Sequence, residues 1–338
     1  MFRRIFWLLN QYSKTYAKGM PSSWVTYLLL SVNGLVFIAM EFAGGSTSSQ
    51  VLINFGAMFG PYIEAGQYWR LFTAIFIHVG WYHLVLNSIG IFIFGRISET
   101  LFGPYKFILI YVLAGLFGAV ASYIFSPISV AAGASGALLG LVGALSGFFL
   151  TMYKDPNARK NLYGLLFLVA INLLFGLAPG IDNWAHIGGL VTGFFLGYFL
   201  TPVSGFLHPG FEGFYVINKF KNSFTRYAAI FIVVFAILGG IWLGNVTLPT
   251  STTTEVLKAE KFLKDRNYTA AIKNIEKAIE LGTLEEKNFV GRAYFLRALI
   301  MVEYGNLEEA KSDLGSALLI ADSETRSKSI ELLTELNN

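Results

Sequence analysis

The sequence predicts an all-α fold, a polytopic bundle of membrane helices joined to a small soluble domain of repeated helices. Of the 338 residues, 54% are hydrophobic and only 14% are charged, a balance typical of integral membrane proteins. The apolar residues gather into runs close to the about 20 residues that a helix needs to cross a bilayer. After the last run the chain becomes rich in charge, with apolar residues at helical spacing.

Seven apolar runs are interpreted as membrane spans. They lie at residues 24–42, 82–98, 106–126, 134–152, 162–178, 184–200 and 227–247. The sequence therefore predicts five sections. The first three are a cytoplasmic amphipathic N-terminal segment at 1–20, a six-span core at 21–203 and a basic cytoplasmic loop at 204–226. They are followed by a seventh transmembrane helix at 227–247 and an extracytoplasmic helical domain at 255–338.

The positive charges predict the orientation of the chain, because loops rich in Lys and Arg stay in the cytoplasm. Of the thirteen Lys and Arg residues before position 255, twelve fall on one side of the predicted spans and only Arg70 falls on the other. We therefore expect a multi-pass protein of the cell membrane with its N-terminus in the cytoplasm and its C-terminal domain outside. The basic net charge then reflects topology in the lipid bilayer, and nothing in the sequence points to nucleic acid.

The segment after the seventh run repeats itself at an offset of 39 residues. "AEKFLKDRNYTAAIKNIEKAIE" from Ala259 aligns with "ALIMVEYGNLEEAKSDLGSALL" from Ala298. The matched pairs are Ala271 with Ala310, Ala278 with Ala317 and Asn267 with Asn306. The pattern resembles tetratricopeptide repeats, whose usual period is 34. Because two units are fewer than a free-standing array needs, we expect a protein partner, a third helix near 324–336 or the membrane domain to cover the exposed face.

Polar side chains inside a membrane are costly and are therefore candidates for function. His83 and Asn87 are four residues apart and share one face of the second span. Ser135 opens the fourth span within "AAGASGALLG", and His186 opens the sixth. All four residues lie toward the outer ends of their spans. Because a serine nucleophile needs a base and its oxyanion needs donors, the set together favours a catalytic site.

Two other interpretations of these residues stay open. A serine between glycines in a membrane helix is usually a packing device that lets two helices approach. His78, His83 and His186 match the three histidine ligands of many zinc sites, which would make this a metal-binding membrane protein. Against a metal, no carboxylate lies nearby at ligand spacing, and Asn87 and Ser135 would have no role.

Three motifs together resemble the rhomboid intramembrane serine proteases in order, spacing and choice of spans. They are "HVGWYHLVLN" in the second span, "GASG" at the start of the fourth and "AHIGGLVTG" at the start of the sixth. The pair Trp69 and Arg70 falls in the long loop after the first span, as in many rhomboids. The resemblance covers about residues 20 to 200. With its seventh span and repeat domain, the whole chain resembles bacterial rhomboids that carry tetratricopeptide repeats outside the cell.

The resemblance implies a serine endopeptidase in which Ser135 attacks a peptide carbonyl and His186 takes its proton, with no cofactor. His83, Asn87 and the Ser135 backbone N–H would hold the oxyanion. The expected substrates are single-span membrane proteins whose helices unwind locally, because a helical backbone hides its carbonyls. Asp182 lies near His186 in the sequence, and whether it orients the imidazole stays open.

The remaining site residues are expected to support this chemistry. Gly133 and Gly136 leave room for a substrate backbone, and Gly189 and Gly193 belong to a small-residue stripe that permits close helix approach. His78 precedes His83 and Asn87 in the second-span motif and is assigned a supporting role.

Trp69 and Arg70 have two interpretations, a structural role in the loop or an ordinary interfacial anchor whose guanidinium reaches outward to water. A catalytically silent rhomboid relative that binds membrane clients, or presents the repeat domain, is an alternative for the whole protein.

Overall fold

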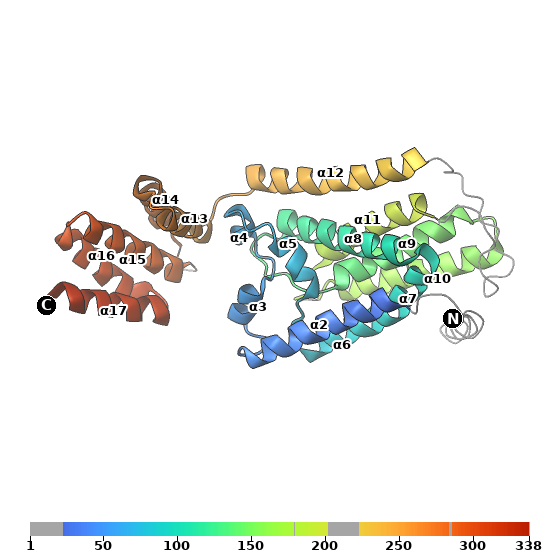
Figure 1. Ribbon diagram of the computed structural model, residues 1–338, viewed down its shortest axis with the longest axis horizontal. Coiled ribbons are helices and arrows are strands. Elements are labelled where there is room, and N and C mark those ends of the chain that lie inside the picture. The colour runs from blue at the N-terminus through green and yellow to red at the C-terminus, as the bar shows by residue number, and fades with distance from the viewer. Residues whose placement is uncertain (1–22, 179, 202–222, 284–285, 338) are drawn as a thin grey trace. The chain divides into compact units, whose positions relative to one another are not determined.

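The computed structural model describes residues 23–178, 180–201, 223–283 and 286–337. Most of these residues are helical (Figure 1), and the predicted all-α polytopic fold is confirmed. The chain divides into two compact units. Gly60–Gln67 and Thr247–Asn338 form one unit, and the rest of the chain up to Val246 forms the other. The predicted amphipathic segment at 1–20 and most of the predicted loop at 204–226 lie outside the described residues.

Five helices of the described chain are long and apolar enough to cross a membrane. They are α2 (Trp24–Phe42), the continuous helix Gly80–Phe102, α8 (Pro104–Phe125), α10 (Pro156–Phe175) and α12 (Ser223–Thr247). The other two predicted spans form α9 (Ser135–Thr151) and α11 (Asn183–Phe199), with 17 residues each. Such a helix rises about 26 Å, less than the about 30 Å of a hydrocarbon core. Each of these two helices is therefore shorter than the hydrocarbon core is thick.

The second predicted span is built from three consecutive pieces. They are α6 (Gly80–Gly90), the π-helical turn η2 (Ile91–Gly95) and α7 (Arg96–Phe102). Glu99 in α7 is buried, and its carboxylate accepts hydrogen bonds from the backbone N–H groups of Val25 and Thr26, at 3.1 and 2.9 Å. The hydroxyl of Thr26 donates to it as well, at 2.7 Å. Glu99 thus caps the first turn of α2, where unpaired N–H groups favour negative charge.

The chain between the first two spans forms short helices. They are α3 (Ser49–Phe55), α4 (Gly60–Glu64), α5 (Arg70–Thr73) and the 3₁₀ turn η1 (Ala74–Phe76). Of these, α4 belongs to the same unit as the C-terminal helices. Glu64 accepts a hydrogen bond of 2.8 Å from the Thr254 hydroxyl in that unit, and burial raises the pKa of its carboxyl.

Glycines bring the backbones of α9 and α11 into direct contact. A Cβ atom at Gly189 would overlap the carbonyl of Gly136, and one at Gly193 would overlap the carbonyl of Gly140. The α8 helix also packs closely on α11, because a Cβ at Gly118 would lie 2.7 Å from the carbonyl oxygen of Ala185. The predicted close approach of the sixth span is therefore present, with α8, α9 and α11 side by side (Figure 1).

The seventh membrane helix, α12, packs on α8. Cβ atoms added at Gly240 and Gly244 would overlap the side chains of Val120 and Tyr123. The Tyr123 hydroxyl donates to the side-chain oxygen of Asn245 at 2.8 Å. The amide of Asn245 in turn donates to the hydroxyl of Tyr68 at 2.9 Å. Through Asn245, helix α12 is thus hydrogen-bonded to α8 and to Tyr68, the residue before Trp69.

The C-terminal unit contains two helix pairs and a fifth helix. The pairs are α13 (Thr252–Lys264) with α14 (Tyr268–Leu281) and α15 (Lys287–Glu303) with α16 (Leu307–Ile320), followed by α17 (Ser323–Asn337). Asn267 and Asn306, matched in the sequence, each cap the second helix of a pair by accepting from a backbone N–H three residues on. Six alanines in matching positions are fully buried: Ala259 and Ala298, Ala271 and Ala310, and Ala278 and Ala317.

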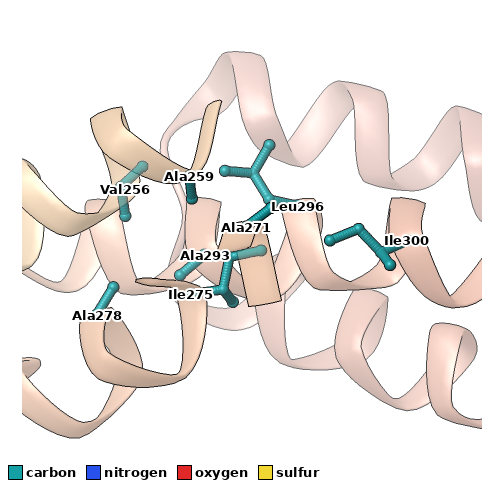
Figure 2. Packing of buried hydrophobic residues seen from close by; sticks show 8 residues of the cluster. All are labelled: Val256, Ala259, Ala271, Ile275, Ala278, Ala293, Leu296 and Ile300. Atoms are coloured by element: carbon teal, nitrogen blue, oxygen red, sulfur yellow. The ribbon is translucent and has the colours of Figure 1, made fainter. Parts of the chain in front are cut away.

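Small residues at these positions let the helices of each pair pack closely. Figure 2 shows the larger of the unit's two apolar clusters, formed by Val256, Ala259, Ala271, Ile275, Ala278, Ala293, Leu296 and Ile300. A smaller cluster in the second pair contains Leu314, and Leu332, Leu333 and Leu336 of α17 pack against it. The additional helix expected near 324–336 therefore covers the second pair.

Candidate active site

Ser135 and His186 lie within hydrogen-bonding distance. The Oγ of Ser135 is 2.9 Å from Nε2 of His186, although the residues are 51 positions apart in the chain. Ser135 is the first residue of α9, and His186 lies in the first turn of α11. The glycine contacts between the two helices hold these N-terminal ends together. His186 is only 6% exposed and Ser135 is half-buried, so the protein largely shields the pair.

The imidazole of His83 lies beside Gly133, two residues before Ser135. Gly133 has a φ of +135°, and a Cβ there would lie 2.6 Å from Cε1 and 2.8 Å from Nε2 of His83. The same Cβ would be 3.7 Å from Oγ of Ser135. Nδ1 of His83 faces the backbone N–H of Val79 at 3.4 Å, which leaves the ring proton on Nε2. The N–H edge of His83 is therefore next to Ser135.

The loop that precedes Ser135 is fixed by backbone hydrogen bonds to the chain between the first two spans. Met58 and Ala131 form an antiparallel bridge with N–H to carbonyl distances of 2.9 and 2.8 Å. The N–H of Gly133 donates to the carbonyl of Ala74 at 2.9 Å. These contacts position Ser135 from a part of the chain more than fifty residues away.

Arg70 supports this arrangement from inside the loop. Its guanidinium donates to the carbonyl of Ile53 at 2.6 Å and to that of Ala57 at 3.2 Å, next to Met58. The guanidinium also lies 4.6 Å from the ring centre of Trp69. Arg70 is only 5% exposed. Its burial contradicts the interpretation as an arginine reaching outward to water and favours the structural role.

The other two polar residues of the second-span motif have structural partners. Asn87 is 4% exposed, and its side-chain N–H donates to the carbonyl of His83 at 2.9 Å, one turn earlier in α6. His78 is fully buried before α6, and its ring meets that of His83 edge-on at 5.3 Å. Burial lowers the pKa of His78 to about 3, so this imidazole is neutral. His78 thus backs the ring of His83.

The three-histidine metal site is not formed. Within the described ranges no three His, Cys, Asp or Glu side chains are grouped as metal ligands. His78 and His83 are neighbours, but His186 faces Ser135.

Two contributions to the site, and one buried acid elsewhere in the fold, were not anticipated from the sequence. Met58 and Ala74 act through backbone atoms, which carry no signal in the residue type. Glu99 did offer a signal, because an acid inside an apolar span requires a partner, and that partner is the start of α2.

Comparison with known proteins gives a family for the chain. Residues 65–203 match the Rhomboid domain family. The chain is 39% identical over 186 residues to rhomboid protease GluP of Bacillus subtilis, which covers 53% of this chain but only 35% of the relative. It is 39% identical over 208 residues to RHOMBOID-like protein 6, mitochondrial, of Arabidopsis thaliana, covering 60% of this chain and 67% of the relative. The putative rhomboid protease YdcA of Bacillus subtilis is 33% identical over 139 residues, covering 40% of this chain and 69% of the relative.

The helix bundle and the matched domain define a polytopic α-helical membrane protein. The chain belongs to the rhomboid family. The family match ends at residue 203, so α12 and the C-terminal helices lie beyond it.

Proposed function

We propose that the chain is an intramembrane serine endopeptidase that cleaves membrane-spanning helices with Ser135 as nucleophile and His186 as base. The observation that carries the proposal is the 2.9 Å approach of Ser135 Oγ to His186 Nε2 at the N-terminal ends of two touching helices. The names of the two Bacillus relatives, a rhomboid protease and a putative rhomboid protease, support the same activity.

In the proposed reaction, the Ser135 hydroxyl gives its proton to Nε2 of His186 and attacks the substrate carbonyl. The negative oxygen that develops is held by Nε2–H of His83 and by the backbone N–H of Ser135. That N–H lies at a helix start, where it has no partner within the helix and the dipole favours negative charge. The amide of Asn87 is the third donor, through the N–H that does not donate to the His83 carbonyl.

His186 then passes its proton to the leaving amine, and water releases the acyl group by the reverse steps. Substrates are single-span proteins whose helices unwind near the cut, because an intact helix keeps its carbonyls in hydrogen bonds. The mechanism uses no cofactor. Water reaches the serine from the outer side, because Ser135 and His186 lie at the N-terminal ends of α9 and α11.

The proposed localisation is the cell membrane, with a cytoplasmic N-terminus and an extracytoplasmic C-terminal unit. We propose that this unit is a tetratricopeptide-like module with a protein partner. The two capped helix pairs and their matched alanines support this assignment.

A cleavage assay on a reporter membrane helix tests the function, together with labelling by a serine-reactive fluorophosphonate. Ser135→Ala and His186→Ala should each abolish cleavage and labelling while the protein still inserts and folds. The double variant should be no worse than either single one, because residues that act as a unit share one contribution. A wild-type protein that neither cleaves nor labels would instead favour the catalytically silent alternative.

A further inference from the structure

Two buried polar atoms close to the serine and histidine have no hydrogen-bond partner within the described part of the chain. They are Nδ1 of His186 and Oδ2 of Asp182. Asp182 is the N-cap of α11, and His186 follows four positions later in the first turn of that helix. Leaving a buried polar group unpaired costs about 1–3 kcal/mol, so two such atoms at one helix start require an explanation.

The proposed reaction determines which of the two atoms is the donor. For Nε2 of a neutral His186 to accept the serine proton, the ring must carry its own proton on Nδ1. Nδ1–H is then a buried donor that needs an acceptor. Oδ2 of Asp182 is a carboxylate oxygen, which only accepts, and it has no donor within the described chain. The two unpaired atoms are therefore chemically complementary.

We propose that Asp182 is a positioning residue that accepts the Nδ1–H of His186 through one ordered water. This inference rests on the proposed function. Asp182 holds the imidazole in the tautomer that the reaction needs and keeps Nε2 directed at Ser135. A water is a suitable bridge, because it pairs with one donor and one acceptor at once.

The position of His186 in the helix gives Asp182 a second task. When His186 takes the serine proton, a positive charge forms in the first turn of α11, where the helix dipole disfavours it. The negative charge of Asp182 at the N-cap opposes that effect. The carboxylate thus stabilises the charged imidazole at the stage of the reaction where the charge appears.

Capping alone does not account for both oxygens of Asp182. Oδ1 accepts from the backbone N–H of Ala185 at 3.0 Å, and this bond completes the N-cap. Oδ2 has no part in that bond. The two functions can therefore be separated by a variant that keeps one oxygen in the capping position and loses the other.

Asp182→Asn is that variant, since Asn is as good an N-cap residue as Asp but has a single oxygen and no charge. Asp155→Asn is the matched control, because Asp155 caps α10 through the N–H groups of Asn157 and Ala158. We expect Asp182→Asn to lower kcat on a reporter membrane helix by about 10- to 100-fold, less than the about 10⁴-fold found where such a carboxylate contacts the base directly. KM and the melting temperature should stay close to wild type, and Asp155→Asn should leave all three quantities unchanged.

Fluorophosphonate labelling of Ser135 provides a second readout that does not depend on the reporter. Labelling of Asp182→Asn should slow by about the same factor as kcat. Asp182→Ser keeps a capping hydroxyl but has no second oxygen. Its kcat and labelling rate for each folded molecule should fall by the same factor, even if its stability falls.

The outcomes separate this inference from the proposed function. Wild-type labelling and cleavage rates in Asp182→Asn and Asp182→Ser would show that Asp182 is only a cap, while the protease assignment would stand. Absence of Ser135 labelling in the wild-type protein would overturn the protease assignment and this inference with it.

Discussion

Among single residues, Gly133 is the one whose missing side chain matters most for the site. Its φ of +135° disfavours any other residue, and a Cβ there would press on Cε1 of His83 at 2.6 Å. We expect Gly133→Ala to store about 1–3 kcal/mol of backbone strain and to displace His83 as well. Loss of that donor should slow fluorophosphonate labelling of Ser135 by up to about 100-fold.

Gly45→Ala is the matched control for Gly133→Ala. Gly45 also has a positive φ, +100°, but no atom lies within 4 Å of a Cβ placed there. It should therefore lower the melting temperature by a similar amount while labelling proceeds at the wild-type rate. Equal labelling rates for the two variants would mean that His83 contributes nothing to the reaction.

Two roles are open for Asn87, which are donation to the oxyanion and support of the α6 helix. The structure pairs its amide with the His83 carbonyl, which is compatible with either role because the amide carries two N–H donors. If Asn87 donates to the oxyanion, Asn87→Ala should lower kcat by about 100-fold or less with little change in KM, since the interaction strengthens only as charge develops. Labelling by the fluorophosphonate should slow in parallel.

A thermal melt of the same Asn87 variant distinguishes the alternative. If Asn87 only supports the helix, Asn87→Ala melts early but cleaves at the normal rate for each folded molecule. That result would mean that the third oxyanion donor is a residue other than Asn87.

At the scale of elements, the contact between α9 and α11 joins the nucleophile to the base. A Cβ at Gly193 would overlap the carbonyl of Gly140, and backbone atoms cannot yield as a flexible side chain does. We expect Gly193→Ala to destabilise the protein by about 1–3 kcal/mol through overpacking. Because α9 and α11 then separate, cleavage should fall even among folded molecules.

Gly239→Ala in α12 is the control for this prediction, since no atom lies within 4 Å of a Cβ at that position. Replacing a helical glycine by alanine there should raise stability by up to about 1 kcal/mol. Melting temperature and labelling rate in detergent measure both effects. A Gly193→Ala protein as stable and active as Gly239→Ala would show that the close approach is not required.

At the scale of the whole molecule, the distribution of basic residues predicts the side on which the C-terminal unit lies. Twelve of the thirteen Lys and Arg residues before position 255 fall on one side of the seven predicted spans. Protease added to intact cells should therefore release the segment after about residue 250, while a tag at Met1 stays protected. A protected C-terminal segment would mean an even number of spans, and the placement of Ser135 toward the outer side would have to be revised.

The sequence alone determined the class of fold, the membrane helices and the residues proposed for catalysis. The predicted spans at 24–42 and 134–152 correspond to helices at Trp24–Phe42 and Ser135–Thr151. These features could be read because length, hydropathy and glycine spacing are properties of consecutive residues. The offset of 39 likewise matched Asn267 with Asn306, and the structure shows that each of them caps the second helix of its pair.

Only the tertiary structure decided how the site is held. It brought Met58 to Ala131 and buried Arg70 under the loop carbonyls, and away from the site it placed Glu99 at the start of α2. It also left Nδ1 of His186 and Oδ2 of Asp182 unpaired at the start of α11. Each of these facts depends on which backbone carbonyl or N–H a distant segment presents, and every residue carries the same two groups. Residue type therefore does not reveal such partners, and the packing of the folded chain selects them.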